Sequence, residues 1–439
     1  MRGPDQLRQL IRQGWEMPDG PGQIALAEEV VRHADALGDR TLSFDARMLA
    51  TSAYHRGGEP AKSFVTFSWC LAEFDADPGS RDPSDDRLLR WFFKYVVSSL
   101  PRFPEVPLAR TAAVLDDMER RYRLGGHSMH AVYNLRWLLA RHVGDEEATD
   151  EWYARWCAAP RDENSDCAGC DPTERILHLV ERGRDAEAVA LAEPVLAGQL
   201  TCAEQPQSML TELLLPYLRT GRLAEARDAH RRAYRAHRGN VANLVAVASH
   251  LTFCARTGNE VRGLEIVQRH IDWLDRAPSP YAAMEFAASA ALVLGRLCAA
   301  GHGDLPVTRR AAGDRPAGDT TVARLAAELR ELATGLAARF DARNGTGYQS
   351  GRIAARLVAE PLVEYLPLSA TARPPRPPSA GGGTGPAATG VVIATAGAIA
   401  AGSAGAGTVP AGPGGVPEAP GAGAGPAPAI PAGATAEEL

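Results

Sequence analysis

The sequence contains almost no lysine: only Lys62 and Lys94 stand among its 47 basic residues, and the others are arginine. Together with abundant Ala, Gly and Pro, this arginine excess is typical of a GC-rich genome and indicates no function by itself. Acidic residues outnumber basic ones, 53 to 47, which gives a formal net charge of −6. A general nucleic-acid binder needs a basic surface that neutralises phosphates. The composition therefore argues against nucleic acid as a partner.

Cysteine is also scarce, with seven residues in a chain of 439. A disulfide-dense scaffold needs more of them, and an odd number fits reduced thiols. The first residues, MRGPDQLRQLIRQGWEM, lack the apolar core of a secretory signal. These features together predict a cytoplasmic protein.

Catalytic motifs are missing from the sequence. It contains no HExxH, no GxSxG and no glycine-rich dinucleotide turn. His127 and His130 could share a metal ion at i, i+3, but no further ligands with matching spacing lie nearby, so surface or capping histidines are expected there. We therefore expect a protein without enzymatic activity.

The C-terminal part of the chain lacks aromatic residues. From Pro377 to Leu439, 45 of 63 residues are Gly, Ala or Pro. Such a segment cannot bury enough apolar surface to offset its chain entropy, which predicts a disordered tail over 369–439 after a folded domain over 1–368. The uncharged run 391–409 is long enough for a membrane span, but it consists mostly of Ala and Gly. A flexible tail is expected instead, with no membrane partner.

The remainder of the chain has the pattern of helices. Apolar residues recur at spacings of three and four, and no alternating strand run bounded by turns is present. Turn glycines recur at intervals of 39, 38 and 37 residues, at Gly144, Gly183, Gly221 and Gly258. A period in this range is typical of a solenoid of stacked helix pairs. The sequence thus predicts an all-α fold of antiparallel helix pairs, near 22–57, 58–100, 101–142, 145–182, 185–219, 222–257 and 260–301, and then a long helix at about 318–340.

The clearest unit is MLTELLLPYLRTGRLAEARDAHRRAYRAH, residues 209–237. Gly221 falls in the turn between its two helices, and Ala226 stands where the second helix needs a small residue. In these positions the chain resembles the tetratricopeptide repeat family, whose unit is a pair of antiparallel helices. A later unit departs from the pattern, with Gly263 and His270 where alanine is usual. The resemblance implies an α-solenoid wound as a right-handed superhelix.

The resemblance also implies a concave face, lined by the first helix of each pair, on which a partner binds. The residues that the register places on this face are Asn134, Arg141, Thr211, Arg219, Thr252 and Arg256. Its arginines could meet an acidic peptide or a C-terminal carboxylate, although each residue could equally belong to a solvated surface. The expected function is a non-catalytic scaffold or adaptor that binds a protein or peptide. Two alternatives stay open: a regulatory or sensor subunit that binds a small ligand or peptide, and an RNA or membrane-surface adaptor acting through the arginine-rich helix 222–238.

The segment DENSDCAGCDPTER, residues 162–175, carries the most specific chemical signal. Cys167 and Cys170 precede a helix expected to begin with Asp171 as its N-cap. In an antiparallel pair the start of the first helix and the end of the second lie at one edge, which would bring Cys202 and Cys157 to the same place. Zinc prefers four ligands in a tetrahedron. The sequence therefore predicts a structural zinc site formed by these four cysteines.

The fourth zinc ligand stays open at this stage, because Cys157, Gln207, Asp166, His178 or a water could serve. Repeat proteins that the chain resembles carry this CxxC with a later CAE element and a His just beyond it, and here Gln207 takes the place of that His. Redox chemistry at the CxxC is disfavoured, because thioredoxin-like enzymes need a βαβ setting with the second cysteine inside the helix. Reduced cysteines that pack as small apolar residues are the remaining interpretation.

Overall fold

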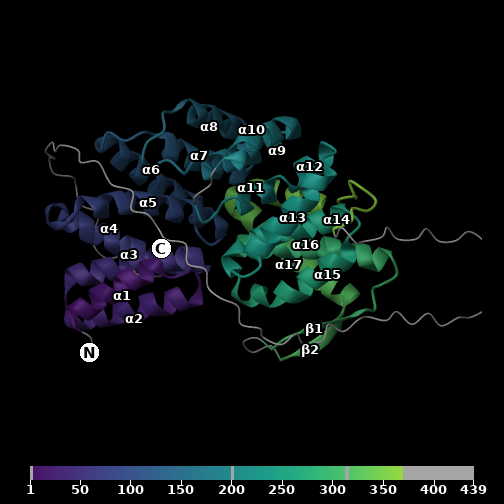
Figure 1. Cartoon of the computed structure of the whole chain (residues 1–439), viewed down its shortest axis with the longest axis horizontal. Coiled ribbons are helices and arrows are strands. Elements are labelled where there is room, and N and C mark those ends of the chain that lie inside the picture. Colours follow the sequence, from purple (N-terminus) through teal and green to yellow (C-terminus); the bar gives the residue numbers. More distant parts are fainter. Residues whose placement is uncertain (1–2, 199–201, 312–315, 369–439) are drawn as a thin grey trace, which may run out of the picture. The chain divides into compact units, whose positions relative to one another are not determined.

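Antiparallel helix pairs follow one another along the computed structural model, which describes residues 3–198, 202–311 and 316–368 (Figure 1). The predicted all-α class is confirmed. The expected tail over 369–439, with its apolar run 391–409, lies outside the described residues. The N-terminal helices are α1 (Pro4–Glu16), α2 (Pro21–Leu37), α3 (Arg40–Gly57), α4 (Pro60–Ala76), α5 (Pro83–Ser99), α6 (Leu108–Leu124), α7 (His130–Val143) and α8 (Glu146–Ala158), with 3-10 turns η1 (Pro78–Ser80) and η2 (Leu100–Arg102).

The C-terminal half continues the pairs and adds a short hairpin. Its helices are α9 (Cys170–Glu181), α10 (Asp185–Ala197), α11 (Gln207–Glu212), α12 (Leu214–Arg219), α13 (Leu223–His237), α14 (Leu244–Arg256), α15 (Glu260–His270), α16 (Pro280–Ala299), α17 (Val322–Asn344) and α18 (Tyr348–Leu357), with 3-10 turns η3 (Val241–Asn243) and η4 (Ile271–Arg276). The strands β1 (Pro306–Arg309) and β2 (Gly318–Thr321) pair antiparallel, with Val307 opposite Thr320. The expectation of a chain without strands, with a helix from about 318, was therefore wrong at this point, because 318–321 pairs with β1 before α17 begins.

The periodic glycines form the turns inside the helix pairs. Gly144, Gly183, Gly221 and Gly258 have φ values of 84°, 71°, 75° and 63°. This left-handed conformation is favourable for glycine and ends a helix, because it directs the chain back along its own length. These turns join α7 to α8, α9 to α10, α12 to α13 and α14 to α15. The predicted spacing of the turn glycines is confirmed. The pairs expected at 145–182, 185–219 and 222–257 were shifted by one helix, because these glycines lie inside helix pairs and not between them.

Close packing explains where the repeat pattern holds and where it departs. Ala226 and Ala233 of α13 are fully buried, as small residues between helices should be. Gly263 of α15 leaves no room for a side chain, since a Cβ there would lie 2.7 Å from Cγ1 of Val293. His270 is buried and its Nε2 lies 3.1 Å from the Tyr234 hydroxyl. The two residues that depart from the repeat pattern, Gly263 and His270, therefore allow α15 to pack against α16 and α13.

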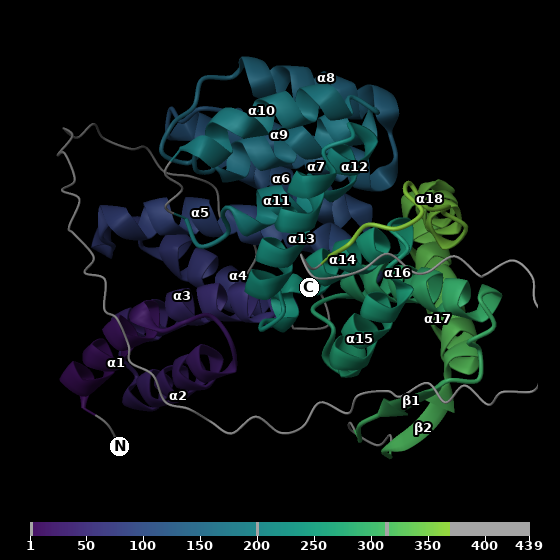
Figure 2. The same cartoon turned by 45° about the vertical axis from the view of Figure 1, so that its right-hand side comes forward.

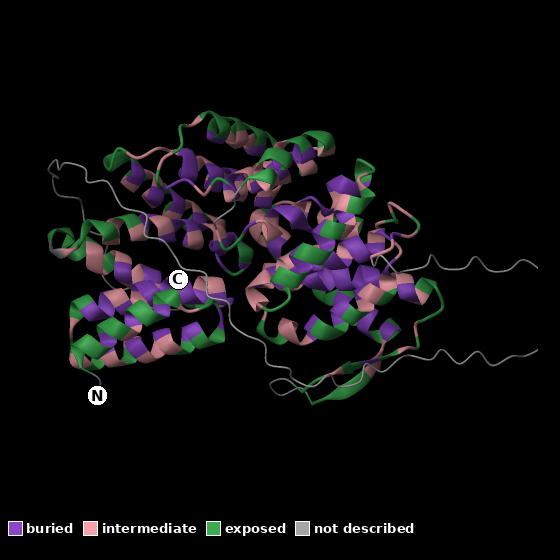
Figure 3. Cartoon of the chain, in the orientation of Figure 1, coloured by how far each residue is buried: buried purple, intermediate pink, exposed green. Residues whose placement is uncertain are grey.

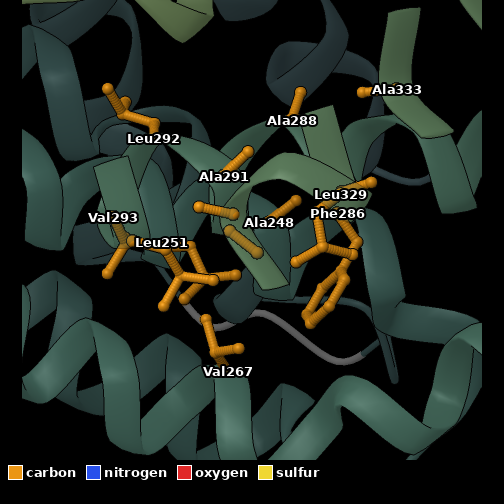
Figure 4. Packing of buried hydrophobic residues seen from close by; sticks show 14 of the residues in the cluster. Ala248, Leu251, Val267, Phe286, Ala288, Ala291, Leu292, Val293, Leu329 and Ala333 are labelled. Atoms are coloured by element: carbon orange, nitrogen blue, oxygen red, sulfur yellow. The ribbon is translucent and has the colours of Figure 1, made fainter. Parts of the chain in front are cut away.

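The largest apolar core is built around α16, which packs against α14, α15 and α17 (Figures 3 and 4). Leu251 from α14, Val267 from α15 and Leu329 from α17 meet the buried side of α16 there. By length and composition α16 could cross a membrane, with a mean hydropathy of 1.5 over its most apolar window, and 72% of that window is buried within the structure. Packing against three helices explains its apolar composition.

The last two helices, α17 and α18, contact segments that lie much earlier in the sequence. Arg343 of α17 donates hydrogen bonds to the backbone carbonyls of Pro101, Phe103 and Val106, at 2.9, 3.0 and 3.2 Å. Just before and within α18, Thr346 and Gln349 donate to the carbonyls of Val143 and His142. Figure 2 shows α17 and α18 beside α16. In a linear solenoid each repeat contacts only its neighbours, so these contacts set this fold apart.

The segment that follows α18 lies along the end of α14. The backbone N–H groups of Leu362 and Leu366 donate to the carbonyls of Arg256 and Thr257 at 2.9 and 3.0 Å. The side chain of Asn259 donates to the carbonyl of Leu366. This segment therefore supplies partners for the carbonyls that the end of a helix leaves without intrahelical bonds.

Candidate functional sites

Three of the four predicted thiols meet in a group that we call the thiol cluster, formed by Cys167, Cys170 and Cys202. Cys167 lies in the loop before α9, Cys170 is the first residue of α9, and Cys202 lies in the segment before α11. All three sulfur atoms lie within 4.8 Å of one another, and Cys170 Sγ is 3.5 Å from Cys202 Sγ. A tetrahedral zinc with Zn–S bonds of about 2.3 Å places its sulfurs about 3.8 Å apart. The donor set and its spacing fit a metal ion.

The protonation of the three thiols differs with their surroundings. Burial opposes ionisation of Cys167, yet the backbone N–H groups of Cys170 and Gly169 together bring its pKa below the ordinary value. Burial raises the pKa of Cys170 well above the ordinary range, against the hydrogen bond from Gln205. Burial also raises the pKa of Cys202. A metal ion bound here would displace the protons of these thiols.

The other proposed ligands have different surroundings. Cys157 is exposed on α8 and interacts with Tyr153. The Asp166 carboxylate accepts a 2.8 Å hydrogen bond from Lys94, and the ring of His178 stacks on Tyr153 at 3.7 Å. The Gln207 amide donates to the carbonyl of Ala203. Within 3–198, 202–311 and 316–368, the cluster thus offers three thiols that could bind a metal ion, and a tetrahedral ion would have one further position for a water or another group.

Two details of the sequence interpretation need correction. The helix begins at Cys170 with Gly169 as its N-cap, so Asp171 does not cap it. The Asp171 carboxylate is buried instead, 2.6 Å from an Arg161 guanidinium nitrogen and 3.2 Å from Nε1 of Trp156. Cys170 therefore does lie inside the helix, and that part of the argument against a redox dithiol was wrong. His130 is also not a surface residue: it is 1% exposed and lies 3.3 Å from Asp171.

The loop that carries Cys167 is held by protein contacts as well. Lys94, one of the two lysines of the chain, is buried and donates 2.8 Å hydrogen bonds to the Asn164 carbonyl and to Asp166. The backbone N–H of Ser128 donates to Asp162. These contacts fix the loop against α5 and the start of α7, whereas the thiols link it to the segment before α11.

The six residues predicted for the concave face have partners of several kinds. Asn134 donates to Glu174, Arg141 forms a bidentate pair with Glu181 at 2.7 and 2.6 Å, and Arg219 lies 3.1 Å from Asp185. The hydroxyl of Thr252 donates to Ser289. Three of the six residues, Thr211, Thr252 and Arg256, line one cavity of about 340 Å³.

We call this cavity the arginine hollow. It lies among α9, α11, α12, α14, α16 and α18, and its lining residues are Val180, Thr211, Glu212, Leu214, Leu215, Ser249, Thr252, Arg256, Glu285, Ser289, Arg352, Ala355, Arg356 and Ala359. A larger hollow of about 650 Å³ lies beside Pro104 and Arg339. Its Arg343 is less available to a ligand, because it is already hydrogen-bonded to three carbonyls and to His142. The smaller cavity is therefore the better ligand site, since several polar groups converge on it.

One carboxylate balances two of the three arginines in the hollow. Glu285 is 5% exposed, contacts Arg352, and lies 2.6 Å from an Arg356 guanidinium nitrogen. Burial opposes its ionisation, but the two guanidinium groups bring the pKa of Glu285 down to about 2. The group of three residues is therefore charged at neutral pH, with a net charge of one positive unit.

Arg256 has no such partner. Its Nε is buried without a hydrogen-bond acceptor, and among the residues that the structure describes no carboxylate lies within ion-pair distance of its guanidinium. Burial lowers the pKa of Arg256, and the positive charges of Arg219 and Arg296 act in the same direction. Across the lining, burial raises the pKa of Glu212 to about 7, against the opposing effect of Arg141. The hollow thus combines an uncompensated arginine with a carboxyl group that is half protonated near neutral pH.

Sequence reasoning missed four residues of this site: Glu212, Glu285, Arg352 and Arg356. A signal for Glu285 was present, because it is the single acidic residue in the apolar stretch 280–299. An acidic residue that is buried within such an apolar stretch needs a partner of opposite charge. Arg352 and Arg356, four residues apart on one helix, are the partners that the structure supplies.

In comparisons with known proteins, no family model, no curated protein and no solved structure matches the chain significantly.

Proposed function

We propose that this protein is a non-catalytic scaffold or adaptor of the tetratricopeptide-repeat type, which binds a protein or peptide partner at the arginine hollow and its surroundings. The observation that carries the proposal is the convergence of Thr211, Thr252 and Arg256 from successive helix pairs on one cavity. An arginine without an internal partner favours an acidic group on the ligand. The cavity size also favours the second candidate, a regulatory or sensor subunit for a small ligand.

Affinity capture from a native lysate of the source organism, followed by mass spectrometry, tests the scaffold function. Full-length protein should capture one stoichiometric partner, and a variant with Arg219→Glu and Arg256→Glu should lose it. Arg324→Glu is the matched control, because Arg324 is 77% exposed on α17 and does not line the hollow. Equal capture by all three proteins, or only background with each, would show that the hollow is not a partner site.

We further propose that the thiol cluster holds a structural zinc ion. Cys167, Cys170 and Cys202 would be its ligands, and the ion would tie the start of α9 to the segment before α11. These two segments belong to successive helix pairs, so the metal would act as a clasp between neighbours. Structural zinc is the better assignment than packing of reduced thiols because the three sulfurs are only partly buried and lie close together.

Elemental analysis of protein purified under reducing conditions tests the clasp, with about one zinc per chain expected. Cobalt(II) substitution gives a second readout, because thiolate ligation produces charge-transfer absorption that a surface-bound ion lacks. Cys202→Ser should weaken both signals. Protein without stoichiometric zinc whose melting temperature does not respond to added zinc or to chelator would rule the clasp out.

A further inference from the structure

We propose that the arginine hollow is a receptor site for a small aliphatic monocarboxylate, bound with its carboxylate on Arg256 and its hydrocarbon chain against Leu214 and Leu215. This inference rests on the proposal that the hollow is a binding site, but it does not require the ligand to be part of a protein. It names the chemical class of ligand that the cavity fits.

The dimensions of the hollow favour a small molecule. Its volume of about 340 Å³ lies at the lower end of the range for ligand pockets, ~300–1,000 Å³. The lining comes from α12, α14, α16 and α18 as well as from α9 and α11, so helices surround it on several sides. Such a space accepts a compact ligand or the end of a chain.

The charge of the lining favours an anion. Glu285 is shared between Arg352 and Arg356, which leaves one positive charge in excess in that group. Arg256 adds a second, and its buried Nε has no acceptor among the described residues. A buried donor without a partner costs free energy, which an acceptor on a ligand would restore. The hollow therefore lacks an acceptor for the Arg256 guanidinium, and a bound anion would supply one.

The polar part of the lining suits a carboxylate group. The planar guanidinium of an arginine matches the two oxygens of a carboxylate. The hydroxyl of Ser289 accepts a hydrogen bond from Thr252 at 3.0 Å and has no acceptor for its own proton in the described parts of the chain. It is thus available to donate to a ligand oxygen.

The apolar part of the lining favours an aliphatic body for the ligand. Val180, Leu214, Leu215, Ala355 and Ala359 line the cavity, and none of the lining residues is aromatic. Burial of methylene groups against these side chains contributes about 0.8 kcal/mol for each group. The lining contains no cysteine or histidine, so the inference concerns binding and not a reaction.

The test uses full-length protein and octanoate, titrated by calorimetry and by the shift in melting temperature. Octanamide is the uncharged probe of the same length, and inorganic phosphate is the second anion. Octanoate should bind at least about tenfold more tightly than octanamide, which corresponds to the loss of a charge-assisted hydrogen bond. Phosphate should not compete.

Three variants locate the site. Arg256→Gln should weaken octanoate binding by about tenfold or more. Ala355→Trp should abolish binding by filling the cavity, and because Ala355 is exposed on α18 the helix should remain folded, as circular dichroism would show. Arg324→Gln should bind like the unmodified protein.

Octanoate binding that is lost with Arg256→Gln and with Ala355→Trp would support the proposal. Equal affinity for octanamide, unchanged binding by Arg256→Gln, or binding of phosphate in place of octanoate would overturn it. A failure of octanoate to bind, together with partner capture that still depends on Arg256, would refute the small carboxylate and leave the scaffold function standing.

Discussion

The thiol cluster and the arginine hollow differ in how the chain balances their polar groups. In the hollow, Glu285 contacts two arginines and neutralises one of their two charges, and Arg256 is the lining arginine without an ion-pair partner among the described residues. In the thiol cluster, three sulfur donors lie within 4.8 Å of one another, and a bound cation would stabilise their deprotonated forms. Three charged groups of the hollow are therefore paired within the chain, whereas the proposed zinc ion would supply the counter-charge of the cluster. This difference predicts that changes in the hollow act on folding with or without metal, and that changes in the cluster act only when metal is present.

The largest effect is expected from Glu285→Gln. It leaves Arg352 and Arg356 without their buried counter-charge, and loss of one partner of a buried ion pair costs about 3–5 kcal/mol of unfolding free energy. Urea unfolding measures this loss. Glu360→Gln is the control, because Glu360 is 86% exposed and its ion pair with Arg296 should contribute less than about 1 kcal/mol.

The same pair also has a defined pH dependence. The pKa of Glu285 is about 2 in the folded state, below its ordinary value of 4.5. The folded state therefore binds this proton less readily than the unfolded state, so the stabilisation is complete above pH 4.5 and is lost as the pH falls towards 2. An effect of Glu285→Gln that stayed the same from pH 7 to pH 2 would contradict the assigned charge state.

The second effect should appear only with zinc. Cys202→Ser should remove about 2.7 kcal/mol of unfolding free energy at a free zinc concentration 100 times the dissociation constant, since a ligand stabilises the folded state by mass action. In chelator the variant should match the unmodified protein. Cys157→Ser sharpens the comparison: it should change nothing if three cysteines hold the metal, and should lower stability in zinc if the thiol on α8 completes the site.

The third effect, from Glu212→Gln, is expected to have the opposite sign, because it should stabilise the protein. Burial raises the pKa of Glu212 to about 7 from an ordinary value of 4.5, so the folded state holds this proton more tightly than the unfolded state. Ionisation of Glu212 therefore costs stability progressively as the pH rises from 4.5 through 7. The variant should nearly match the unmodified protein at pH 4.5 and exceed its unfolding free energy by up to about 3 kcal/mol at pH 8, because one pKa unit corresponds to about 1.4 kcal/mol. Denaturant curves at both values measure this, and a constant difference would refute the assigned pKa.

Local patterns predicted the turns between helices and part of both sites. The turn glycines follow from backbone conformation, and the meeting of Cys167, Cys170 and Cys202 follows from which helix ends share an edge. Thr211, Thr252 and Arg256 were placed on one face by register alone, and they line one cavity. These features depend on short stretches of sequence.

The other features of the fold and the sites depend on contacts between residues far apart in the sequence. A periodic pattern of apolar residues does not predict such contacts. Arg343 meets carbonyls about 240 positions earlier in the chain, and Arg352 meets Glu285 across 67 positions. The helix that contributes Arg352 to the hollow could therefore not be placed there from the sequence. The burial of His130 has a similar origin, because it depends on Asp171 and Trp156 from other segments.

The return of α17 and α18 to η2 and α7 also fixes the number of helix pairs. An open array can gain or lose a unit at little cost, because each unit contacts only its neighbours. Here the contacts of Arg343 and Gln349 close a loop in the chain, so that everything from α8 to α16 must span a set distance. We therefore expect a duplicated or deleted pair to separate those contacts, a cost that a linear repeat protein does not have.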